Sequence, residues 1–435
     1  MTHPSPFTLT LWGDWSPTIG LAEARLHDPE ALYGALSAVL RRADLNVLNL
    51  EGVFAPPDAR PIIKDGRPLT LPQAALPALR PFRMVCLANN HIMDFGAQGL
   101  RHTLHVLAAQ GIAWTGVHAP PDSPPSPPPP LPEWLHLINA AEGEEARAVD
   151  GMPGANPLHV EALCRETAQR TAQGQRVIVV LHMGREHWCF PAPYVQQAGR
   201  TLAEAGAALV VGHHPHVPQG VEVWQGTHIV YSLGNFALRP ATNWRWHTLG
   251  FGLEVRFEHR EAPPEVYFHP YEITPAGLRA LEGEAAQAFN GETLPQLSES
   301  LQDPARLRVL WDAYVDDFLQ HRGAEEISGG LAGLWGTRWG TASLWRGAAN
   351  RIADTSLKGR LTRRLLRGAA ALLGRAAPRV TVSPATARQA AILRNRFDTP
   401  AHRELWLRGL ERLMDGTFGD SPPWALEALK QWHLP

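Results

Sequence analysis

The residues best suited to chemistry in this sequence lie directly after apolar runs. The densest group is GHHPHVPQG at residues 212–220, where His213, His214 and His216 follow the run GAALVV. Other apolar runs are followed by, or end in, the same kinds of residue: Asp14, Glu51, Asn90 with His91, and His182. Carboxylates and imidazoles without thiolates favour manganese, iron or zinc over soft-metal or cluster chemistry. These residue types therefore predict a site for one or two divalent metal ions.

The elements along the first 275 residues or so are expected to bring these side chains together. The apolar runs typical of strands lie at 7–12, 45–50, 83–88, 134–140, 176–182, 207–212 and 227–233. Between them, segments such as 29–43, 97–110 and 157–172 repeat leucine and alanine at helical spacing. This alternation predicts a layered α/β domain, in which the loops at the carboxyl ends of the strands meet along one rim. A bridging carboxylate at Glu51 would allow two ions about 3.5–4 Å apart, which activate water and neutralise a developing oxyanion.

Each of these residues also has an ordinary structural interpretation. A single histidine at a strand end is usually a hydrogen-bonded surface or core residue. Asn90 and Asp94 are also suited to turn or cap positions before the helix expected near Ala97, and Glu51 could be a solvated loop carboxylate. These interpretations do not explain why such residues coincide at several strand ends, so the coincidence favours a shared site.

The chain divides into two predicted domains, residues 1–275 and 276–435. Near the end of the first, LGFGLEVRFEH and PPEVYFHPYEI alternate apolar and polar residues, which predicts an antiparallel hairpin and hence a mixed sheet. The proline-rich segment 119–132 predicts an extended surface loop. Segments 304–321 and 401–416 are typical of helices. The second domain is therefore expected to be helical.

Composition narrows the functional classes. The 435 residues carry a formal charge of −2 and a pI near 6.9, which gives no support to a nucleic-acid partner. Cys86, Cys164 and Cys189 lack CxxC spacing, so neither a disulfide framework nor a thiolate zinc site is expected. The N-terminal sequence has no signal-peptide pattern, and no window reaches about 18 uncharged apolar residues. We therefore expect a soluble, cytoplasmic protein.

Five stretches of the sequence resemble the successive signatures of the CapA family. They are GDW at 13–15, NLEG at 49–52, LANNHIMDFGAQGL at 87–100, LHMGREH at 181–187 and VVGHHPHVPQGVEVWQGTHIVYSLGNF at 210–236. The CapA family comprises poly-gamma-glutamate capsule-biosynthesis proteins built on the calcineurin-like metallophosphoesterase fold. The resemblance extends from about residue 7 to 274, with the proline-rich loop as an insertion. It implies a four-layered αββα sandwich with mixed sheets and a site at its rim, followed by a helical C-terminal extension.

The resemblance also implies a set of metal ligands at that rim. They are Asp14, Glu51, Asn90, His182, His214 and His216. Asp14 matches an aspartate of the first metal, and Glu51 stands where the bridging carboxylate lies. Asn90 and His182 match ligands of the second metal. The closing His-x-His pair supplies one imidazole to each ion.

Residues beside these ligands have implied roles in catalysis. His91 occupies the place of an imidazole that stabilises the leaving group or the transition state. Asp94 would orient that ring, because a carboxylate partner fixes the tautomer and raises the basicity of a histidine. Accessory candidates at the same rim are His213, Glu186, His187 and Asn235.

Three of these motifs depart from the pattern of the fold or of the family. Trp15 and Ser16 follow Asp14 where phosphoesterases usually carry Asp-x-His, so the first metal loses an imidazole. Glu51 replaces a shorter aspartate, and both changes are similar to those of the CapA family itself. Met183 and His187 stand where the family tends to have aromatic residues. His187 is therefore a candidate for the missing ligand.

Two functions of different classes fit these residues. The first is a metal-dependent hydrolase that attacks a phosphoester, or an amide or other bond of an anionic polymer, with a metal-bound hydroxide as nucleophile and His91 assisting. The second is a non-catalytic component of capsule or polyglutamate assembly that binds a carboxylate-rich chain. Retention of His91 and Asp94 favours the first, since a binding site needs no positioned proton donor. The missing imidazole after Asp14 favours the second.

The C-terminal region offers a candidate membrane contact. Residues 338–379 hold ten lysines or arginines and one acid, Asp354. Their leucines and arginines fall on opposite faces of a helix, which, with Trp339 and Trp345 upstream, could lie on the anionic inner face of a membrane. A helix that packs its leucines into the C-terminal bundle is the alternative that we favour.

Overall fold

The computed structural model describes two compact units of the chain. The described residues are 6–18, 20–143, 146–148, 151–240, 242, 244–323 and 384–433. Unit 1 comprises Met1–Ile62, Arg67–Arg308 and Lys430–Pro435, and unit 2 comprises Ile63–Gly66 and Val309–Leu429. The sequence predicted a domain boundary after residue 275. Unit 1 continues to Arg308 because a further strand and the short helices that follow it pack on its sheets.

The first sheet of unit 1 is mixed. In order, its strands are β14 (Gly277–Ala280), β13 (Glu265–Thr274), β12 (Leu249–Phe257), β1 (Phe7–Trp15), β2 (Leu45–Leu50), β3 (Met84–Cys86) and β4 (Ala113–Thr115). Strands β1 to β4 run parallel, and β12 to β14 are antiparallel. The predicted hairpin is confirmed as β12 and β13, whose register runs from Leu249↔Glu272 to Arg256↔Glu265.

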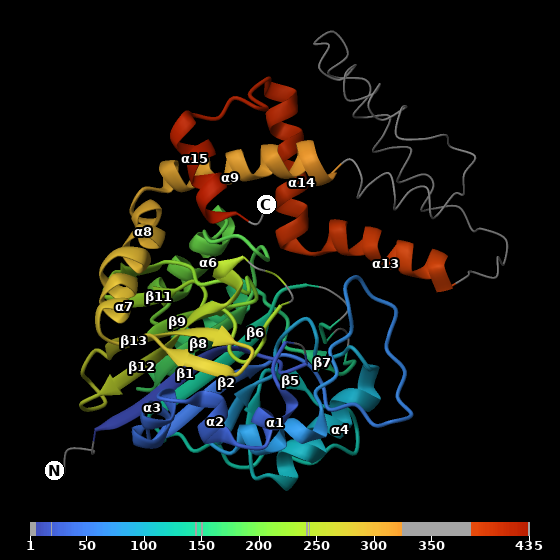
Figure 1. Cartoon of the computed structure of the whole chain (residues 1–435), viewed down its shortest axis with the longest axis vertical. Helices are drawn as coiled ribbons and strands as arrows, with labels where there is room; N and C mark the ends of the chain where they lie inside the picture. Colours follow the sequence, from blue (N-terminus) through green and yellow to red (C-terminus); the bar gives the residue numbers. More distant parts are fainter. Residues whose placement is uncertain are drawn as a thin grey trace. The chain divides into compact units, whose positions relative to one another are not determined.

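The second sheet of unit 1 is also mixed (Figure 1). Its strands are, in order, β10 (Val221–Trp224), β11 (Thr227–Val230), β9 (Leu209–His213), β8 (Arg176–His182) and β6 (Leu135–Ala141). All pair in parallel except β10 with β11. A small separate ladder joins β5 (Val117–His118) to β7 (Gly154–Ala155). The proline-rich segment 119–132 was predicted to be an extended loop, and it contains neither helix nor strand.

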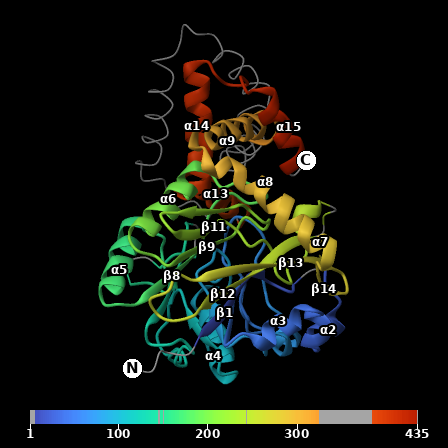
Figure 2. The same ribbon diagram turned by 90° about the vertical axis from the view of Figure 1, so that its left-hand side faces the viewer.

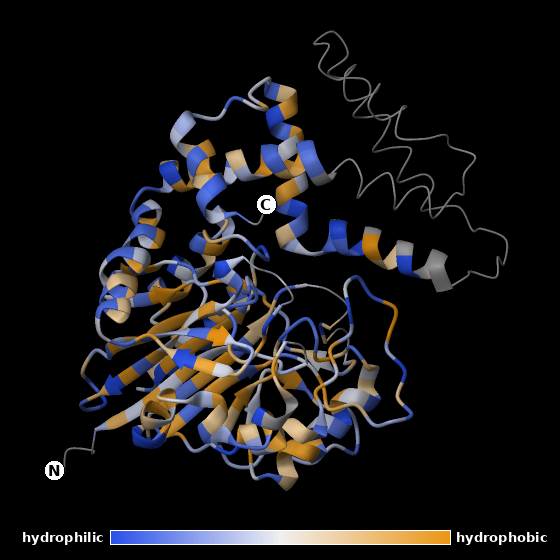
Figure 3. Ribbon diagram, viewed as in Figure 1, coloured by the Kyte–Doolittle hydropathy of each residue, from blue (hydrophilic) through white to orange (hydrophobic). Residues whose placement is uncertain are grey.

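The two sheets pack face to face because the strands alternate their side chains. In β1, Leu9 and Leu11 lie in one buried core with Ile178 and Val180 of the second sheet. Trp12 lies on the opposite face of β1, in a second core with the helices. Figure 3 shows the apolar residues concentrated along the strands of both sheets. The burial of each such leucine or valine contributes about 1.5–3 kcal/mol to stability.

Helices cover the outer face of each sheet and complete the four-layered αββα sandwich that was predicted. The first sheet is covered by α1 (Glu23–Leu26), α2 (Pro29–Tyr33), α3 (Leu36–Arg42), α4 (Gly96–Ala109) and η1 (Gln73–Leu79). The second is covered by α5 (Val160–Ala172) and α6 (Pro193–Glu204). Figure 2 shows α5 and α6 on one side of the strands, and α2 and α3 on the other.

The predicted helix at 29–43 is interrupted. Gly34 ends α2 with a φ of 52°, in the left-handed region that favours glycine, and α3 begins at Leu36. One short helix, η2 (Arg245–His247), lies between β11 and β12. The short helices that follow β14 are α7 (Gly283–Ala288), η3 (Phe289–Thr293), α8 (Leu294–Glu299) and η4 (Ser300–Gln302). They extend unit 1 into the region predicted to belong to the second domain.

Unit 2 is helical, as predicted for the C-terminal part. Its elements within the described residues are most of α9 (Pro304–Phe318), η5 (Leu319–Gly323), α13 (Pro384–Asp398), α14 (Pro400–Asp415) and most of α15 (Pro423–Trp432). Arg412 of α14 donates to both carboxylate oxygens of Asp316 at 2.9 and 2.7 Å. Arg408 does the same to Asp312 at 2.6 and 2.8 Å. These paired charges align α9 with α14.

The candidate membrane contact at residues 338–379 lies outside the described residues. Among the helices within the described ranges, none combines the length and apolar character needed to cross a bilayer.

An aromatic cluster fixes the loop after β11. The ring centroid of Phe236 lies 4.7 Å from that of Trp12, 5.3 Å from that of Tyr33 and 5.4 Å from that of Tyr271. All four side chains are fully buried. The amide of Phe236 donates to the carbonyl of Asp14 at 2.7 Å, so the cluster also ties this loop to the end of β1.

The same loop requires glycine in β1. A Cβ atom at Gly13 would lie 1.9 Å from the carbonyl oxygen of Gly234, so no side chain fits there. The amide of Asp14 donates to that carbonyl at 3.1 Å. The carboxyl end of β1 therefore lies directly against the loop that follows β11.

We expect Phe236→Ala to destabilise unit 1 by about 3–5 kcal/mol, because it removes the ring at the centre of this cluster. Urea unfolding followed by tryptophan fluorescence measures the change. Val223, which is 57% exposed on β10, supplies the control, and Val223→Ala should cost less than about 0.5 kcal/mol. Equal effects of the two substitutions would contradict the structural role of the cluster.

Candidate metal centre

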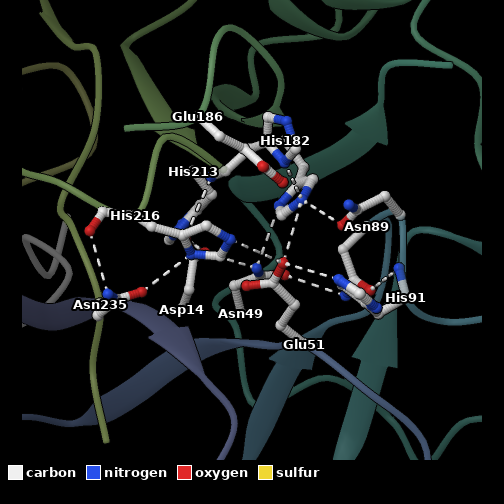
Figure 4. Close-up of polar contacts among 12 residues, drawn as sticks. Asp14, Asn49, Glu51, Asn89, His91, His182, Glu186, His213, His216 and Asn235 are labelled. Atoms are coloured by element: carbon white, nitrogen blue, oxygen red, sulfur yellow. Dashed lines mark hydrogen bonds and ion pairs between the residues drawn. The ribbon is translucent and has the colours of Figure 1, made fainter. Parts of the chain in front are cut away.

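The residues predicted to bind metal meet at the carboxyl ends of the strands. Asp14 lies near the end of β1, Glu51 directly follows β2, and His182 is the last residue of β8. The loop after β3 carries Asn90 and His91, and the loop after β9 carries His214 and His216. Figure 4 shows side chains from segments that are distant in sequence turned toward one centre, and Asp14 and His214 are 200 residues apart.

One group of donors consists of Glu51, His182 and His214, whose ligand atoms lie within 4.8 Å of one another. Nε2 of His182 is 3.6 Å from Oε1 of Glu51 and 3.1 Å from Nδ1 of His214. It also lies 3.0 Å from Oδ1 of Asn90. Two imidazole nitrogens, an amide oxygen and a carboxylate oxygen thus face one point.

The second group consists of Asp14, Glu51 and His216, again within 4.8 Å. Nδ1 of His216 lies 3.5 Å from Oδ2 of Asp14, and Nε2 lies 3.7 Å from Oε1 of Glu51. Glu51 therefore belongs to both groups, which is the geometry of a carboxylate that bridges two ions.

Asn235 fixes the tautomer of His216. Its amide nitrogen donates to the carbonyl oxygens of His216 and His247 at 3.0 and 3.1 Å, so the orientation of the amide is determined. Its Oδ1 then accepts from Nδ1 of His216 at 2.9 Å. When the ring is neutral, its proton therefore sits on Nδ1, and Nε2 presents its lone pair to the pocket beside Glu51.

The charges in the two groups call for a compensating cation. Asp14 and Glu51 are both fully buried. Burial alone would raise the pKa of Asp14, but hydrogen bonds from His213 and His216 hold it well below its ordinary value. Burial alone would lower the pKa of His216, but Glu51 and Asp14 raise it to about 10. Two buried carboxylates thus attract positive charge to this position.

The imidazoles of the other group are neutral. Burial lowers the pKa of His214 to about 4. Burial and then the neighbouring His214 hold the pKa of His182 well below its ordinary value. Neutral imidazoles and ionised carboxylates are the forms that bind metal. The residues present therefore fit two divalent ions of the manganese, iron or zinc type, and their chemistry does not select one of these metals.

His91 and Asp94 form a pair at the edge of the pocket. Nδ1 of His91 lies 2.7 Å from Oδ2 of the fully buried Asp94. The same oxygen accepts from the amide of Leu69 at 2.6 Å, which holds the carboxylate in place. Nε2 of His91 lies 4.0 Å from Oε1 of Glu51. The carboxylate thus orients the ring with its second nitrogen toward the pocket.

The remaining accessory candidates lie outside the two donor groups. Nδ1 of His213 is 3.1 Å from Oδ1 of Asp14, so it orients that carboxylate. The carboxylate of Glu186 points toward the imidazoles of the centre (Figure 4). Nδ1 of His187 lies 2.9 Å from Nε2 of His247 and is paired with it. The structure therefore places His187 beside the donors rather than among them.

The loops of the centre adopt an unusual backbone. His214, His216 and His187 have φ angles of 98°, 59° and 61°. Residues other than glycine rarely adopt positive φ, and such strain persists only where surrounding contacts enforce it. Here the amide of His214 donates to Oδ2 of Asp14 at 3.1 Å, and that of His187 donates to the carbonyl of Pro215 at 2.9 Å.

Sequence reasoning missed three polar residues that support the centre. The amide nitrogen of Asn49 donates to Oδ1 of Asp14 at 2.8 Å and lies 3.2 Å from Nδ1 of His182. Asn89 donates to Oδ1 of Asn49 at 3.3 Å, and His247 holds His187. Asn49 carried a signal, because an asparagine within the apolar run LNVLNL must find partners when it is buried. The sequence around His247 carried no comparable signal.

A family model confirms the resemblance seen in the sequence. The model described as "Bacterial capsule synthesis protein PGA_cap" matches residues 8–128 and 135–239, which is just over half of the chain. All of the donor residues described above fall within these two ranges.

Several curated relatives have names that refer to the synthesis of a polymer or a capsule. The "PGA biosynthesis protein CapA" of Bacillus subtilis is 32% identical over 160 residues, which cover 36% of this chain and 42% of that protein. The "Probable polyglutamine synthesis accessory protein Rv0574c" of Mycobacterium tuberculosis is 32% identical over 228 residues, which cover 47% and 58%. The "Capsule biosynthesis protein CapA" of Bacillus anthracis is 26% identical over 163 residues, which cover 36% and 40%.

The alignments span about half the length of these relatives. Among solved structures, that of TT1561 from Thermus thermophilus covers 61% of this chain and 98% of that chain at 10% identity, with a TM-score of 0.32. A score this low carries no argument. The family match rests instead on two long segments that contain every motif at the rim, and this chain belongs to the bacterial capsule synthesis protein family PGA_cap.

Proposed function

We propose that this protein is a metal-dependent hydrolase of capsule or poly-gamma-glutamate biosynthesis that cleaves a bond in an anionic substrate. The observation that carries the proposal is the position of Glu51, which belongs to two groups of buried donors at once. A structural histidine cluster has no need of a shared carboxylate, whereas a two-ion hydrolytic site does.

The donor residues would divide between the two ions. Asp14, Glu51 and His216 would bind the first ion, and Glu51, Asn90, His182 and His214 the second. When bound, such ions lower the pKa of water and neutralise the negative charge that develops on the substrate. Asn235 and His213 would keep the ligands His216 and Asp14 in their binding orientations.

His91 is placed to handle the proton of the leaving group. Because Asp94 accepts from Nδ1, the ring can donate or accept a proton at Nε2, which faces the pocket. Asp94 also stabilises the ring while it carries a positive charge, as in other histidine–carboxylate pairs. This arrangement suits departure of an alkoxide or amide group from an anionic substrate.

One observation favours the alternative, a site that binds an anionic polymer without cleaving it. Of the two donor groups found among the described residues, the one that contains Asp14 has a single imidazole, that of His216. Trp15, which stands near the usual position of a second histidine, is buried and donates to the hydroxyl of Tyr33 at 3.1 Å. Weak binding of the first ion would leave a site for carboxylates rather than a hydrolase.

Metal loading tests the shared role of Glu51. Protein purified without chelator and supplied with manganese should hold two equivalents by elemental analysis. His216→Ala should retain about one, because it belongs to a single group, whereas Glu51→Ala should lose both. His105→Ala, which changes an exposed histidine on α4, should retain two. Two equivalents in Glu51→Ala would refute a bridging carboxylate.

Turnover tests the role of His91. On an aryl phosphodiester or on polyglutamate, His91→Ala should lower kcat by about 10²–10⁴-fold with metal content unchanged. Asp94→Asn should lower it by about 10- to 100-fold, because it removes the charge that orients the ring. Full metal loading of the wild-type protein with no turnover of any anionic substrate would instead favour the polymer-binding alternative.

A further inference from the structure

Two histidines beside the metal centre have no part in the proposed reaction. The ring of His187 stacks on the ring of His216 with centroids 5.9 Å apart and an interplanar angle of 29°. Its Nδ1 lies 2.9 Å from Nε2 of His247, and the side chain is 34% exposed. His187 thus stands at the mouth of the pocket, next to the group formed by Asp14, Glu51 and His216.

A chain of hydrogen bonds determines which nitrogen of His187 carries the proton. Nδ1 of His247 lies 3.2 Å from the hydroxyl of Thr242, and that hydroxyl accepts from the amide of Trp244 at 3.0 Å. In one arrangement the hydroxyl donates to Nδ1 of His247, and Nε2–H of His247 donates to Nδ1 of His187. In the other, every proton in the chain is reversed.

The first arrangement is favoured for two reasons. It uses the hydroxyl proton of Thr242, which the reversed chain leaves without an acceptor within the chain. It also places an N–H at Nε2 of His187, whereas the reversed chain would direct a lone pair toward the carboxylate of Glu186. The distance from Nε2 to Oε2 of Glu186 is 3.8 Å, which is too long for a hydrogen bond but close enough for charge to matter.

The backbone around both histidines is held firmly. The amide of His187 donates to the carbonyl of Pro215, between the two ligands His214 and His216. Trp246, which precedes His247, lies 4.5 Å from Trp432 between ring centroids and donates to the carbonyl of Gln431 at 3.2 Å. Because unit 1 includes residues 430–435, these contacts belong to the fold that carries the centre.

We infer that His187 forms a subsite in which Nε2–H donates to an oxyanion of the substrate, a phosphate or a carboxylate, and that His247 is the positioning residue that holds this tautomer. The inference rests on the proposed function, because Glu186 would repel an anion unless the bound ions offset its charge. Oxyanion binding at His187 is therefore expected only in metal-loaded protein.

The tautomer can be tested without metal or turnover. In protein with ¹⁵N-labelled histidine, long-range ¹H–¹⁵N spectra distinguish a protonated ring nitrogen from a bare one, and loss of signals in His187→Gln assigns the ring. We expect a bare Nδ1 and a protonated Nε2. His247→Ala should mix the two tautomers, and His247→Gln, whose amide can replace Nε2–H, should restore the first. A protonated Nδ1 in the wild-type protein would overturn the inference.

Anion binding tests the subsite itself. Calorimetric titration of manganese-loaded protein with inorganic phosphate and, separately, with glutarate distinguishes the two oxyanions. His187→Ala should weaken the affinity for at least one of them by about 10- to 100-fold, as expected for a hydrogen bond to a charged group. His187→Gln, which keeps a donor near Nε2, should stay within about 3-fold of wild type, and His105→Ala should bind as wild type does.

The outcomes separate this inference from the proposed function. Unchanged affinity for both anions in His187→Ala, with two equivalents of metal still bound, would overturn the subsite and leave the hydrolase proposal intact. Failure of the wild-type protein to bind metal would overturn both. Weaker binding of phosphate alone, or of glutarate alone, would support the subsite and identify its oxyanion.

Discussion

The complete burial of the Glu51 carboxyl group is the constraint on which the rest of the centre depends. A carboxylate removed from water is tolerated only where donors or cations compensate it. Imidazoles from the end of β8 and from the loop after β9 lie within 3.7 Å of its Oε1. Two sheets packed face to face bring those segments to one rim. The aromatic cluster around Phe236 holds the loop after β11 against the end of β1 at that rim. The sandwich thus supplies the compensation that this residue requires.

A second layer of polar residues makes the first layer specific. Asn235 fixes the proton of His216, and Asp94 fixes the orientation of His91. Asn49 donates to Asp14 and so fixes the orientation of that carboxylate. In each case a buried group with a fixed donor or acceptor decides which atom of its neighbour faces the pocket. The strained backbone of His214 and His216 is tolerated because these contacts hold both residues from several sides.

Much of this arrangement could be predicted from local pattern. Long apolar runs gave the bounds of β2 and β8, and the donors could be located because they directly follow such runs. The sequence pattern did not predict the three-residue β4 or the helix break at Gly34. A very short strand and a single left-handed residue produce almost no periodicity in the sequence. Asn49 and His247 act through partners distant in sequence, which one chain alone does not reveal. The predicted domain boundary follows the change from strand-like to helix-like sequence after residue 275. The compact unit extends to Arg308, because the extent of a compact unit depends on which elements pack together and not on their type.

The contacts of Trp432 have a consequence for how the protein is made. Unit 1 is assembled from three stretches of chain, and the last of them begins at Lys430. Synthesis proceeds from the N-terminus, and the early part of a nascent chain folds as it emerges. The loop that carries Trp246 and His247 must therefore wait for about 185 further residues before its aromatic partner leaves the ribosome. During that interval the sheets can form, but Trp246 lacks the ring against which it packs.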